Sequence, residues 1–524
     1  MENSKNNNTQ KKRAYELWLV IVPLGAIAAL SVWFLLQPEQ SVASLTNFGS
    51  FFVSKTGWFF MITPLILIIL SLQWAFSKKG KIRMGGPEAK ATYPLWSYIG
   101  MLFCASLAGG SCIFSMVEWS YYYAAPPFGI EPLSIEAAKW SIPFNMFHWG
   151  ITPASLYLLL AIPFCYMFYV RKHQTLKLGN MVGIMIGDKP YRTPVTKIVN
   201  LIFVIVIVGG FACTLGLGIP NVANCLMAVF GFKNELVVSI VITVVISLIF
   251  SFSSYLGLSK GMSKLSTINI VWAFAFLAVI LVSGSTIFTL ENSITSVGKM
   301  LNEFLTMATN LDAIGQSGFA QVWTIFFYSY SWAYVAVIAV LIVRISYGRT
   351  FREMIFSVLL GVPAGAWVLM GINGSNSLDY QLSGRLDVAS IVTNEGNHAA
   401  VVSILGETIM GPVIGVLAFA IMIIMFLATS LDSASLSLAE ATTLDSENGK
   451  EPAPILRLVW CVILAVIPLI MTAVGADLNA LQAFVNVACW PILIVGIYMW
   501  GKTIKWAKED QPTIEQITPA QKEH

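Results

Sequence analysis

The chain has 524 residues, of which 56% are hydrophobic and 11% charged, and its formal net charge is +4. Its mean hydropathy is +0.74. Too little polar surface exists to cover a soluble core of this size, so the composition excludes a soluble globular protein and predicts a polytopic membrane protein. The small positive charge is explained by basic loops, and no nucleic-acid partner is expected.

Long apolar runs recur along the chain, and each can cross the hydrocarbon layer as a helix. The sequence predicts an all-α membrane protein with its surface in contact with the lipid bilayer. The twelve predicted spans are 15–36, 57–76, 94–123, 143–170, 196–219, 236–257, 265–290, 320–343, 353–374, 402–431, 454–473 and 479–500.

Lysine and arginine divide unevenly between alternate loops. With the N-terminus inside, only five of the 31 basic residues lie outside, namely Lys55, Lys139, Lys233, Lys299 and Arg385. Because basic loops are retained on the cytoplasmic side, both termini are predicted to be cytoplasmic. The Asn-rich head is interpreted as a tail and not a signal peptide, because the apolar run behind it is too long and many spans follow.

Two segments and the cysteines do not follow the ordinary span pattern. Residues 293–310 carry apolar side chains at three-four spacing, which predicts a helix lying along the outer interface. Residues 386–400 are interpreted as a second surface segment. The seven cysteines lie in or next to apolar spans without metal-ligand spacing, so they are interpreted as small packing residues.

Residues 327–334 place four Tyr and Trp rings on one short, otherwise apolar stretch. Tyr328, Trp332 and Tyr334 are expected to share roughly one helical face. A methylated ammonium ion cannot be hydrogen-bonded, but it binds to the negative face of aromatic rings with about 0.5 to 2 kcal/mol per ring. The alternative interpretation is that these rings anchor the helix at a membrane interface.

Ionisable residues inside spans are costly, so each is a functional hypothesis. Glu118, His148 and Asp432 are the candidates, and for each a structural, hydrogen-bonded role is the alternative. One alternative function is a membrane enzyme that uses these three residues as acid and base groups. No nucleophile motif, metal spacing or cofactor fingerprint supports it, so no catalytic residue is expected.

Hydroxyl groups precede Asp432 in the tenth predicted span, at Thr429 and Ser430. Hydroxyls and backbone carbonyls are hard oxygen donors, which suit an alkali cation better than a transition metal. In the third span, residues 106–112 are mostly small. They permit either close helix packing or a local unwinding that frees carbonyls to line a cavity.

Four motifs occur in one order on these spans: Phe147-His148-Trp149-Gly150, Trp323-Thr324-Ile325, Arg344-Ile345-Ser346-x-Gly348-Arg349-Thr350-x-Arg352-Glu353 and Ala428-Thr429-Ser430-x-Asp432-Ser433. With them, the chain resembles the betaine/choline/carnitine transporter family over nearly its full length. The segment from Tyr121 to Pro132 is most similar to the carnitine/butyrobetaine exchanger branch.

The resemblance implies twelve helices, with helices 3–7 and 8–12 forming two inverted five-helix repeats of the leucine-transporter type. It also implies a homotrimer in a bacterial or archaeal plasma membrane. The expected divisions are a cytoplasmic tail (1–14), two peripheral helices with an inner loop (15–92), a first repeat (93–292), an interfacial helix (293–319), a second repeat (320–500) and a cytoplasmic tail (501–524).

The resemblance also implies which residues bind the substrate. The aromatic box would be formed by Tyr121, Trp149, Tyr330 and Tyr334, with Ser331 and Trp332 as neighbouring candidates. The family usually has Trp-x-Trp-Trp where this chain has residues 328–331. Two indoles have become phenols and one a hydroxyl, so the ligand is smaller, accepts hydrogen bonds from the hydroxyls, or is enclosed by other residues.

The expected activity is secondary active transport of methylated or quaternary ammonium compounds, with sodium as coupling ion and no other cofactor. Cation-independent exchangers of the family carry an arginine where this chain has Asn269, which favours sodium symport. The resemblance implies sodium ligands at Cys104, Leu107, Phe426, Thr429 and Ser430. The alternatives are carnitine/butyrobetaine-type exchange and a carrier of the same fold for amines or amino acids.

Overall fold

The computed structural model describes residues 16–257, 261–443, 452–474 and 490–510. These residues are almost entirely helical, and the single β-type contact among them is an isolated bridge between Arg83 and Thr350. The predicted all-helical class is therefore confirmed.

Eight helical segments of the described chain are long and apolar enough to cross a membrane, and a broken pair makes a ninth. The pair is α3 (Leu95–Ser106) with α4 (Ala108–Ala124), bent by 72°. The eight are Glu39–Phe76, Ile135–Val170, Arg192–Phe230, Glu235–Gly257, Ser263–Ser283, Ala320–Ile345, Phe351–Leu382 and Gly411–Thr442.

The other three predicted spans also coincide with helices. They correspond to α1 (Trp18–Leu36), α19 (Pro454–Val474) and α21 (Trp490–Glu509). Part of the last prediction, 479–489, lies outside the described residues.

Two predicted spans were wrong at one boundary, because hydropathy averaged along the chain does not resolve a short turn. The predicted span 265–290 joins α10 (Ser263–Ser283) to the start of α11 (Thr286–Asn302), yet the chain turns at Gly284. A Cβ there would lie 2.0 Å from Asn376 Nδ2, so a larger residue would displace that buried side chain. The predicted span 402–431 likewise runs through a turn between α17 (Asn397–Gly406) and α18 (Gly411–Thr442).

Further helices complete these spans. α2 (Pro38–Phe76) starts well before the predicted 57. α5 (Ile135–His148) and α6 (Ile151–Cys165) share one span, as do α14 (Phe351–Phe356) and α15 (Val362–Leu382). α8 (Arg192–Phe230) and α9 (Glu235–Gly257) follow α7 (Leu178–Ile186), while α12 (Phe304–Thr309) and α16 (Val388–Asn394) are short.

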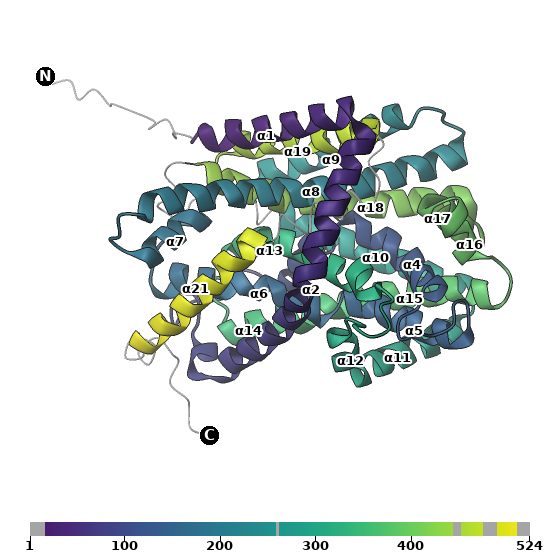
Figure 1. Ribbon diagram of the computed structural model, residues 1–524, viewed down its shortest axis with the longest axis horizontal. Helices are drawn as coiled ribbons and strands as arrows, with labels where there is room; N and C mark the ends of the chain where they lie inside the picture. Colours follow the sequence, from purple (N-terminus) through teal and green to yellow (C-terminus); the bar gives the residue numbers. More distant parts are fainter. Residues whose placement is uncertain (1–15, 258–260, 444–451, 475–489, 511–524) are drawn as a thin grey trace, which may run out of the picture.

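Helix α13 (Ile325–Ile345) lies in the interior and packs along α6. Twenty of its residues are buried, all except Arg344. Figure 1 shows α1, α8 and α19 running side by side along the length of the molecule, with α2 crossing them obliquely. A helix with no lipid-facing side can carry rings and hydroxyls for an internal site without exposing them to hydrocarbon.

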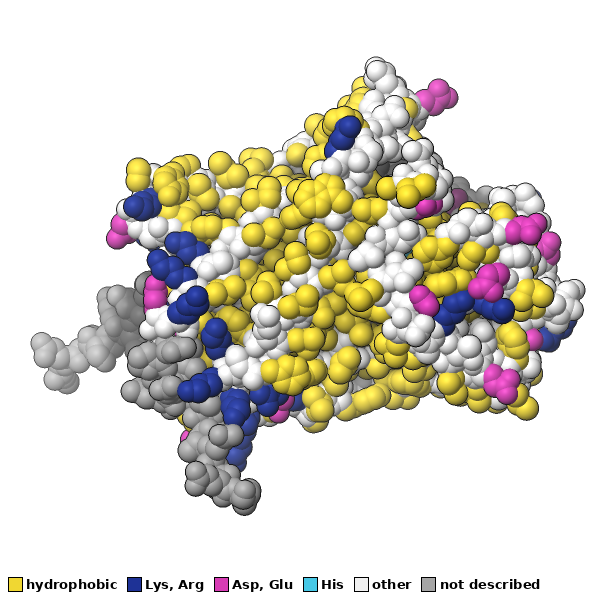
Figure 2. All heavy atoms as spheres, turned by 60° about the horizontal axis from the view of Figure 1, so that its bottom comes forward, with side chains coloured by type: hydrophobic (Ala, Val, Ile, Leu, Met, Phe, Trp, Pro, Cys, Tyr) yellow, Lys and Arg dark blue, Asp and Glu magenta, His cyan; other side chains and the backbone are white. Residues whose placement is uncertain are grey.

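The outer surface has an apolar belt with charges gathered beyond it. In Figure 2, lysine and arginine side chains cluster at one end and acidic side chains are concentrated towards the other. Figure 1 places α7, α14 and the end of α21 at the first end, which we call the basic end. Helices α16 and α17, which contain the predicted surface segment 386–400, lie at the opposite end.

The predicted amphipathic segment 293–310 forms most of α11 and α12. Helix α11 packs on α5 and α15. Met300 is buried, whereas Ile294 and Leu305 are 72% and 65% exposed. The apolar side chains therefore divide between the protein interior and the outer surface. The role as an interfacial helix stays a prediction.

Candidate functional site

A small cavity lies where two helix breaks, the α3–α4 bend and the α5–α6 turn, meet the first third of α13. Its volume is about 20 Å³, room for little more than one water molecule. The lining comes from the α3–α4 bend, the α5–α6 turn, α6, α13 and the start of α15: Ser106, Leu107, His148, Trp149, Gly150, Pro153, Ala154, Tyr157, Phe327, Tyr330, Ser331 and Val362.

Trp149 reaches this cavity because the chain leaves helical geometry beside it. Helix α5 ends at His148, and α6 begins at Ile151. A Cβ at Gly150 would lie 3.0 Å from Met146 O and 3.2 Å from Trp367 Nε1, so glycine allows the tight turn. Trp367 Nε1 donates to Met146 O at 3.1 Å, so a carbonyl in the last turn of α5 is hydrogen-bonded by a side chain of α15.

A buried carboxylate holds the Trp149 ring. Glu118, which is fully buried on α4, accepts a hydrogen bond from Trp149 Nε1 at 2.8 Å. Its other oxygen accepts from Tyr122 OH at 2.6 Å, and that hydroxyl lies 2.7 Å from His148 Nδ1. His148 Nε2 lies 3.1 Å from Thr324 Oγ1. The network joins α4, α5 and the start of the α13 span behind the indole.

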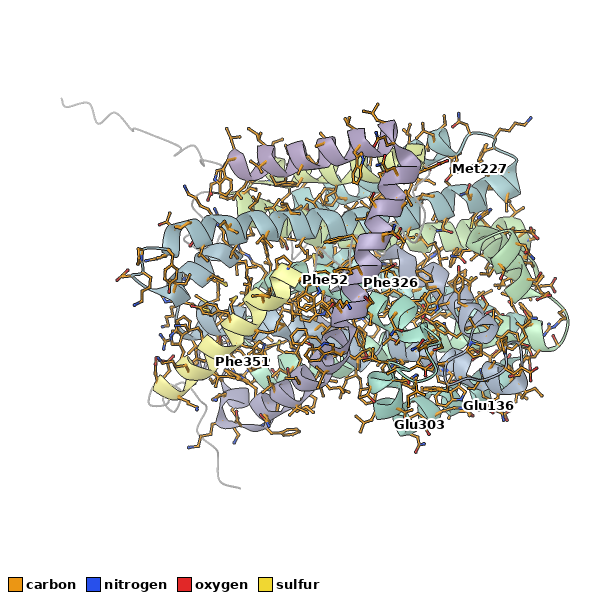
Figure 3. The ribbon with its side chains drawn as sticks, viewed as in Figure 1. Phe52, Glu136, Met227, Glu303, Phe326 and Phe351 are labelled. Atoms are coloured by element: carbon orange, nitrogen blue, oxygen red, sulfur yellow. The ribbon has the colours of Figure 1, made fainter. Side chains whose placement is uncertain are left out.

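Aromatic rings from α4 and α13 surround Trp149. Its ring centroid lies 5.3 Å from that of Phe327, 6.3 Å from Tyr330 and 6.5 Å from Phe114. The planes of Trp149 and Tyr330 are inclined by 72°. Figure 3 labels Phe326, which packs on Tyr330 at 5.9 Å, between Phe351 at the basic end and Glu136 at the other.

The structure brings together only part of the predicted aromatic box. Trp149, Tyr330 and Ser331 line the cavity, whereas Tyr121, Trp332 and Tyr334 are not among its lining residues. The Tyr121 ring packs on Trp323 at 4.8 Å, and its hydroxyl donates to Asn397 Oδ1 at 2.7 Å. Tyr121 therefore belongs to the contact between α4 and α17, and the four predicted rings do not enclose one hollow.

Tyr334 and Trp332 are fully buried elsewhere on α13. The Tyr334 ring packs on Phe211 of α8, with centroids 4.9 Å apart. Tyr328, Trp332 and Tyr334 were expected to share a face, but the residues of α13 that border the cavity are Phe327, Tyr330 and Ser331. The predicted box omits Phe327 and Tyr157. Phe327 begins the ring-rich stretch but cannot be told from a packing phenylalanine, and a lone Tyr in an apolar run gives no signal.

The α3–α4 bend places backbone oxygens beside the hydroxyls of α18. Thr429 Oγ1 lies 3.5 Å from Cys104 O and 2.9 Å from Phe426 O. Ser430 Oγ lies 3.4 Å from Cys104 O. Four of the five predicted sodium ligands thus lie together, and their hard oxygens are of the kind that bind an alkali cation. The carbonyl of Leu107, the fifth, accepts from Ser111 Oγ at 2.5 Å.

Asn269, the position at which the family resemblance implies an arginine in exchangers, contacts the same segment. Its amide nitrogen lies 3.7 Å from Cys104 Sγ, and the side chain is fully buried. Among the described residues, no cluster of three or more His, Cys, Asp or Glu side chains can hold a metal ion. A hard cation held by carbonyls and hydroxyls is the kind of ion this region suits.

Asp432 does not join the cavity. Its carboxylate forms a buried ion pair with Arg457 of α19 and accepts from Ser253 Oγ of α9 at 2.6 Å. Removing one partner of such a pair leaves an uncompensated buried charge, so a structural role follows from these contacts. The predicted acid/base trio is therefore divided: Glu118 and His148 share one network and Asp432 belongs to another.

Residues 18–512 match the sequence pattern of the betaine/carnitine/choline transporter family, abbreviated BCCT. This chain belongs to that family. It is a family of transporters, so the alternative of a membrane enzyme is wrong.

A carnitine transporter of Acinetobacter baumannii is 30% identical over 453 residues, which cover 86% of this chain and 82% of the relative. The uncharacterized transporter YeaV of Escherichia coli (strain K12) is 30% identical over 455 residues, covering 86% and 93%. Among solved structures, a Na+-coupled sialic acid symporter in a substrate-bound outward-open state is 13% identical, with a TM-score of 0.41 over 88% of this chain and 85% of that chain.

Proposed function

We propose that this BCCT-family transporter carries a methylated or quaternary ammonium compound, of the betaine, carnitine or choline type, by sodium-coupled symport. The observation that carries the proposal is the joint position of two features on one bend: Leu107 borders the Trp149–Tyr330 cavity, and the Cys104 carbonyl faces Thr429 and Ser430. The lining has several ring faces and neither lysine nor arginine, which suits a cation that has no hydrogen to donate. The cavity would have to widen to admit such a cation.

The energy for such transport would come from sodium. A zwitterionic betaine crosses without net charge, so the membrane potential alone cannot concentrate it. Each co-transported sodium ion adds about 2.3 kcal/mol per 100 mV. At 1.36 kcal/mol per tenfold change, that supports a gradient of about fiftyfold.

The proposal is tested in proteoliposomes with labelled glycine betaine, carnitine, choline and smaller methylamines. We expect uptake of at least one of them to rise with an inward sodium gradient and to fall when potassium replaces sodium. Uptake that ignores sodium but needs internal substrate would reject symport and favour the exchanger alternative. Asn269, which supplies no fixed positive charge, argues against that alternative.

Removing rings from the cavity distinguishes the proposed transporter from a carrier of ordinary amines or amino acids. We expect Trp149→Leu and Tyr330→Leu each to reduce binding of a quaternary ammonium at least tenfold, because about 1.4 kcal/mol of cation–π attraction is lost per ring. A site built on hydrogen bonds to a primary amine would keep most of its affinity in both variants. Tyr255→Leu, in an exposed side chain of α9, is the matched control.

We further propose the finer arrangement that the family resemblance implies. Both termini would face the cytoplasm of a plasma membrane, the helices after α2 would form two inverted five-helix repeats, and three copies would assemble. The gathering of lysine and arginine at the basic end supports the proposed orientation.

A further inference from the structure

Three hydroxyls from two helices meet beside the cavity. They belong to Thr214 of α8 and to Tyr330 and Tyr334 of α13, and none of the three residues is more than 4% exposed. Thr214 Oγ1 lies 3.0 Å from Tyr330 OH and is hydrogen-bonded to Tyr334 OH. The two phenol oxygens lie 3.5 Å apart. Only Tyr330 borders the cavity.

The two helices are close enough for this contact because of a glycine. A Cβ at Gly210 would lie 2.6 Å from Ala333 Cβ, so a larger residue would force α8 away from α13. Thr214 stands one helical turn further along α8 and lies 3.1 Å from Gly210 O. The close approach and the hydroxyl cluster are therefore parts of one helix contact.

Counting protons assigns a direction to these hydrogen bonds. A threonine hydroxyl has one proton and can accept two hydrogen bonds. When that proton goes to the Gly210 carbonyl, Thr214 accepts from both tyrosines. Both phenol protons then form hydrogen bonds within the protein. A ligand in the cavity would therefore contact the Tyr330 ring and receive no hydrogen bond from its hydroxyl.

We propose that Thr214 is a positioning residue for the ammonium site: by accepting from Tyr330 it fixes the ring opposite Trp149, and so makes the site select methylated nitrogen. This inference rests on the proposed function and narrows its substrate class to cations recognised by ring faces. Without the acceptor, each of the two buried phenols loses its partner on α8, and only the long contact of 3.5 Å between the two phenol oxygens is left to hold the Tyr330 ring. The Tyr330 ring then no longer stays in one place relative to Trp149.

The first test compares Thr214→Val with wild type in binding of tetramethylammonium, which carries the methylated nitrogen and nothing else. We expect the dissociation constant to rise about fivefold to tenfold, the size of one lost hydrogen bond. Thr214→Ser, which keeps the hydroxyl, should restore binding to within about twofold. Thr243→Val is the matched control, because that buried hydroxyl on α9 donates to the Ser239 carbonyl of its own helix.

The second test separates positioning from general damage. Tyr330→Phe removes the same hydrogen bond from the other side, so we expect it to weaken tetramethylammonium binding similarly. When Thr214→Val is added to Tyr330→Phe, the dissociation constant should rise by less than about a further twofold, since the effects of coupled residues are not additive. Selectivity for tetramethylammonium over ammonium should fall in both variants.

Each remaining result counts against the inference. Two results would overturn it while the proposed function stands. One is a wild-type dissociation constant in Thr214→Val. The other is a double variant whose dissociation constant rises by the product of the two single fold-changes. If Thr214→Val does not fold, full affinity and selectivity in Tyr330→Phe would overturn it equally. If wild type takes no methylated ammonium compound, the proposed function fails and this inference fails with it.

Discussion

The Glu118 side chain is a buried carboxylate placed next to the rings of the candidate site. Carboxylates inside the bilayer are costly unless they are paired or hydrogen-bonded. Here the two oxygens accept from Trp149 and Tyr122. The same contacts that make burial tolerable therefore determine where the Trp149 indole points.

This role predicts the effect of removing the carboxylate. Glu118→Leu should lower the affinity for the transported ammonium compound about tenfold, because the buried indole N–H loses its acceptor, and an unsatisfied buried donor costs roughly 1 to 3 kcal/mol. Glu118→Gln keeps an acceptor and should lose less. Equilibrium binding followed by intrinsic fluorescence measures both. Glu136→Gln, whose side chain is 48% exposed, is the control, and equal affinities in all three variants would contradict the role.

Residue types could be predicted from sequence better than the directions of their side chains. Trp149 and Tyr330 were found because their motifs resemble the family's. Tyr121 came from the same resemblance, yet its hydroxyl bonds to Asn397 on α17. Thr214 had no signal at all, because its partners are more than a hundred residues away in the chain and the contact depends on how closely α8 approaches α13.

The break between α3 and α4 is the element that joins the two candidate sites. A Cβ at Gly109 would lie 2.6 Å from Leu427 Cγ and 2.9 Å from Ile423 Cγ2 on α18. We therefore expect Gly109→Ala to push α4 away from α18 and to reduce the uptake rate at least fivefold, since overpacking costs about 1 to 3 kcal/mol. Uptake by reconstituted protein, normalised to the amount inserted, measures this.

Gly298→Ala on α11 is the matched control for that change, because a Cβ there meets nothing within 4 Å. Its uptake should equal that of wild type. Normal uptake by Gly109→Ala would show that α4 and α18 are not as tightly packed during transport as they are in this structure.

The hydroxyls of α18 give a prediction for the ion. Thr429→Ala should raise the sodium concentration for half-maximal uptake about tenfold, because a neutral oxygen ligand is worth roughly 1 to 2 kcal/mol here. The maximal rate at high sodium should recover. Ser437→Ala is the control, since that hydroxyl donates to Ser433 O on its own helix. An unchanged sodium dependence in Thr429→Ala would remove this site from the mechanism.

Helices could be predicted well from hydropathy, but their ends could not. The polar breaks at these turns are short, residues 283–286 around Gly284 and 407–408 before Gly411, so hydropathy averaged over a long window shows no gap. The 72° bend after Ser106 had a weaker indication in the small residues around it, which are equally compatible with close packing. Turns inside the membrane depend on contacts with other helices, and a single sequence does not contain those contacts.

At the scale of the molecule, the unequal distribution of charge predicts its orientation. Cysteines introduced at Lys78 and Glu131, both exposed, should be labelled from opposite sides of the membrane, with Lys78→Cys on the inside. The six natural cysteines in the described chain are buried, which limits background labelling. Labelling of sealed cells with an impermeant maleimide measures this, and a signal at Lys78→Cys before lysis would contradict the orientation.

The helical class and the apolar belt could be predicted from composition, and the basic end from the charges of the loops, because each is a sum over many residues. The placement of α13 wholly inside the molecule was less accessible. Its apolar run looks like any other span in the sequence, yet the described part of the molecule leaves it no lipid-facing side.

The sharp bend after α3 has one more consequence. Cys104 and Leu107 are a single helical turn apart: the Cys104 carbonyl faces Thr429, and Leu107 borders the Trp149–Tyr330 cavity. If a bound ion tightens that turn for the organic solute, thermodynamic reciprocity requires the solute to tighten it equally for the ion. A carrier built in this way would reduce slippage, since either ligand alone stabilises the arrangement less than the two do together.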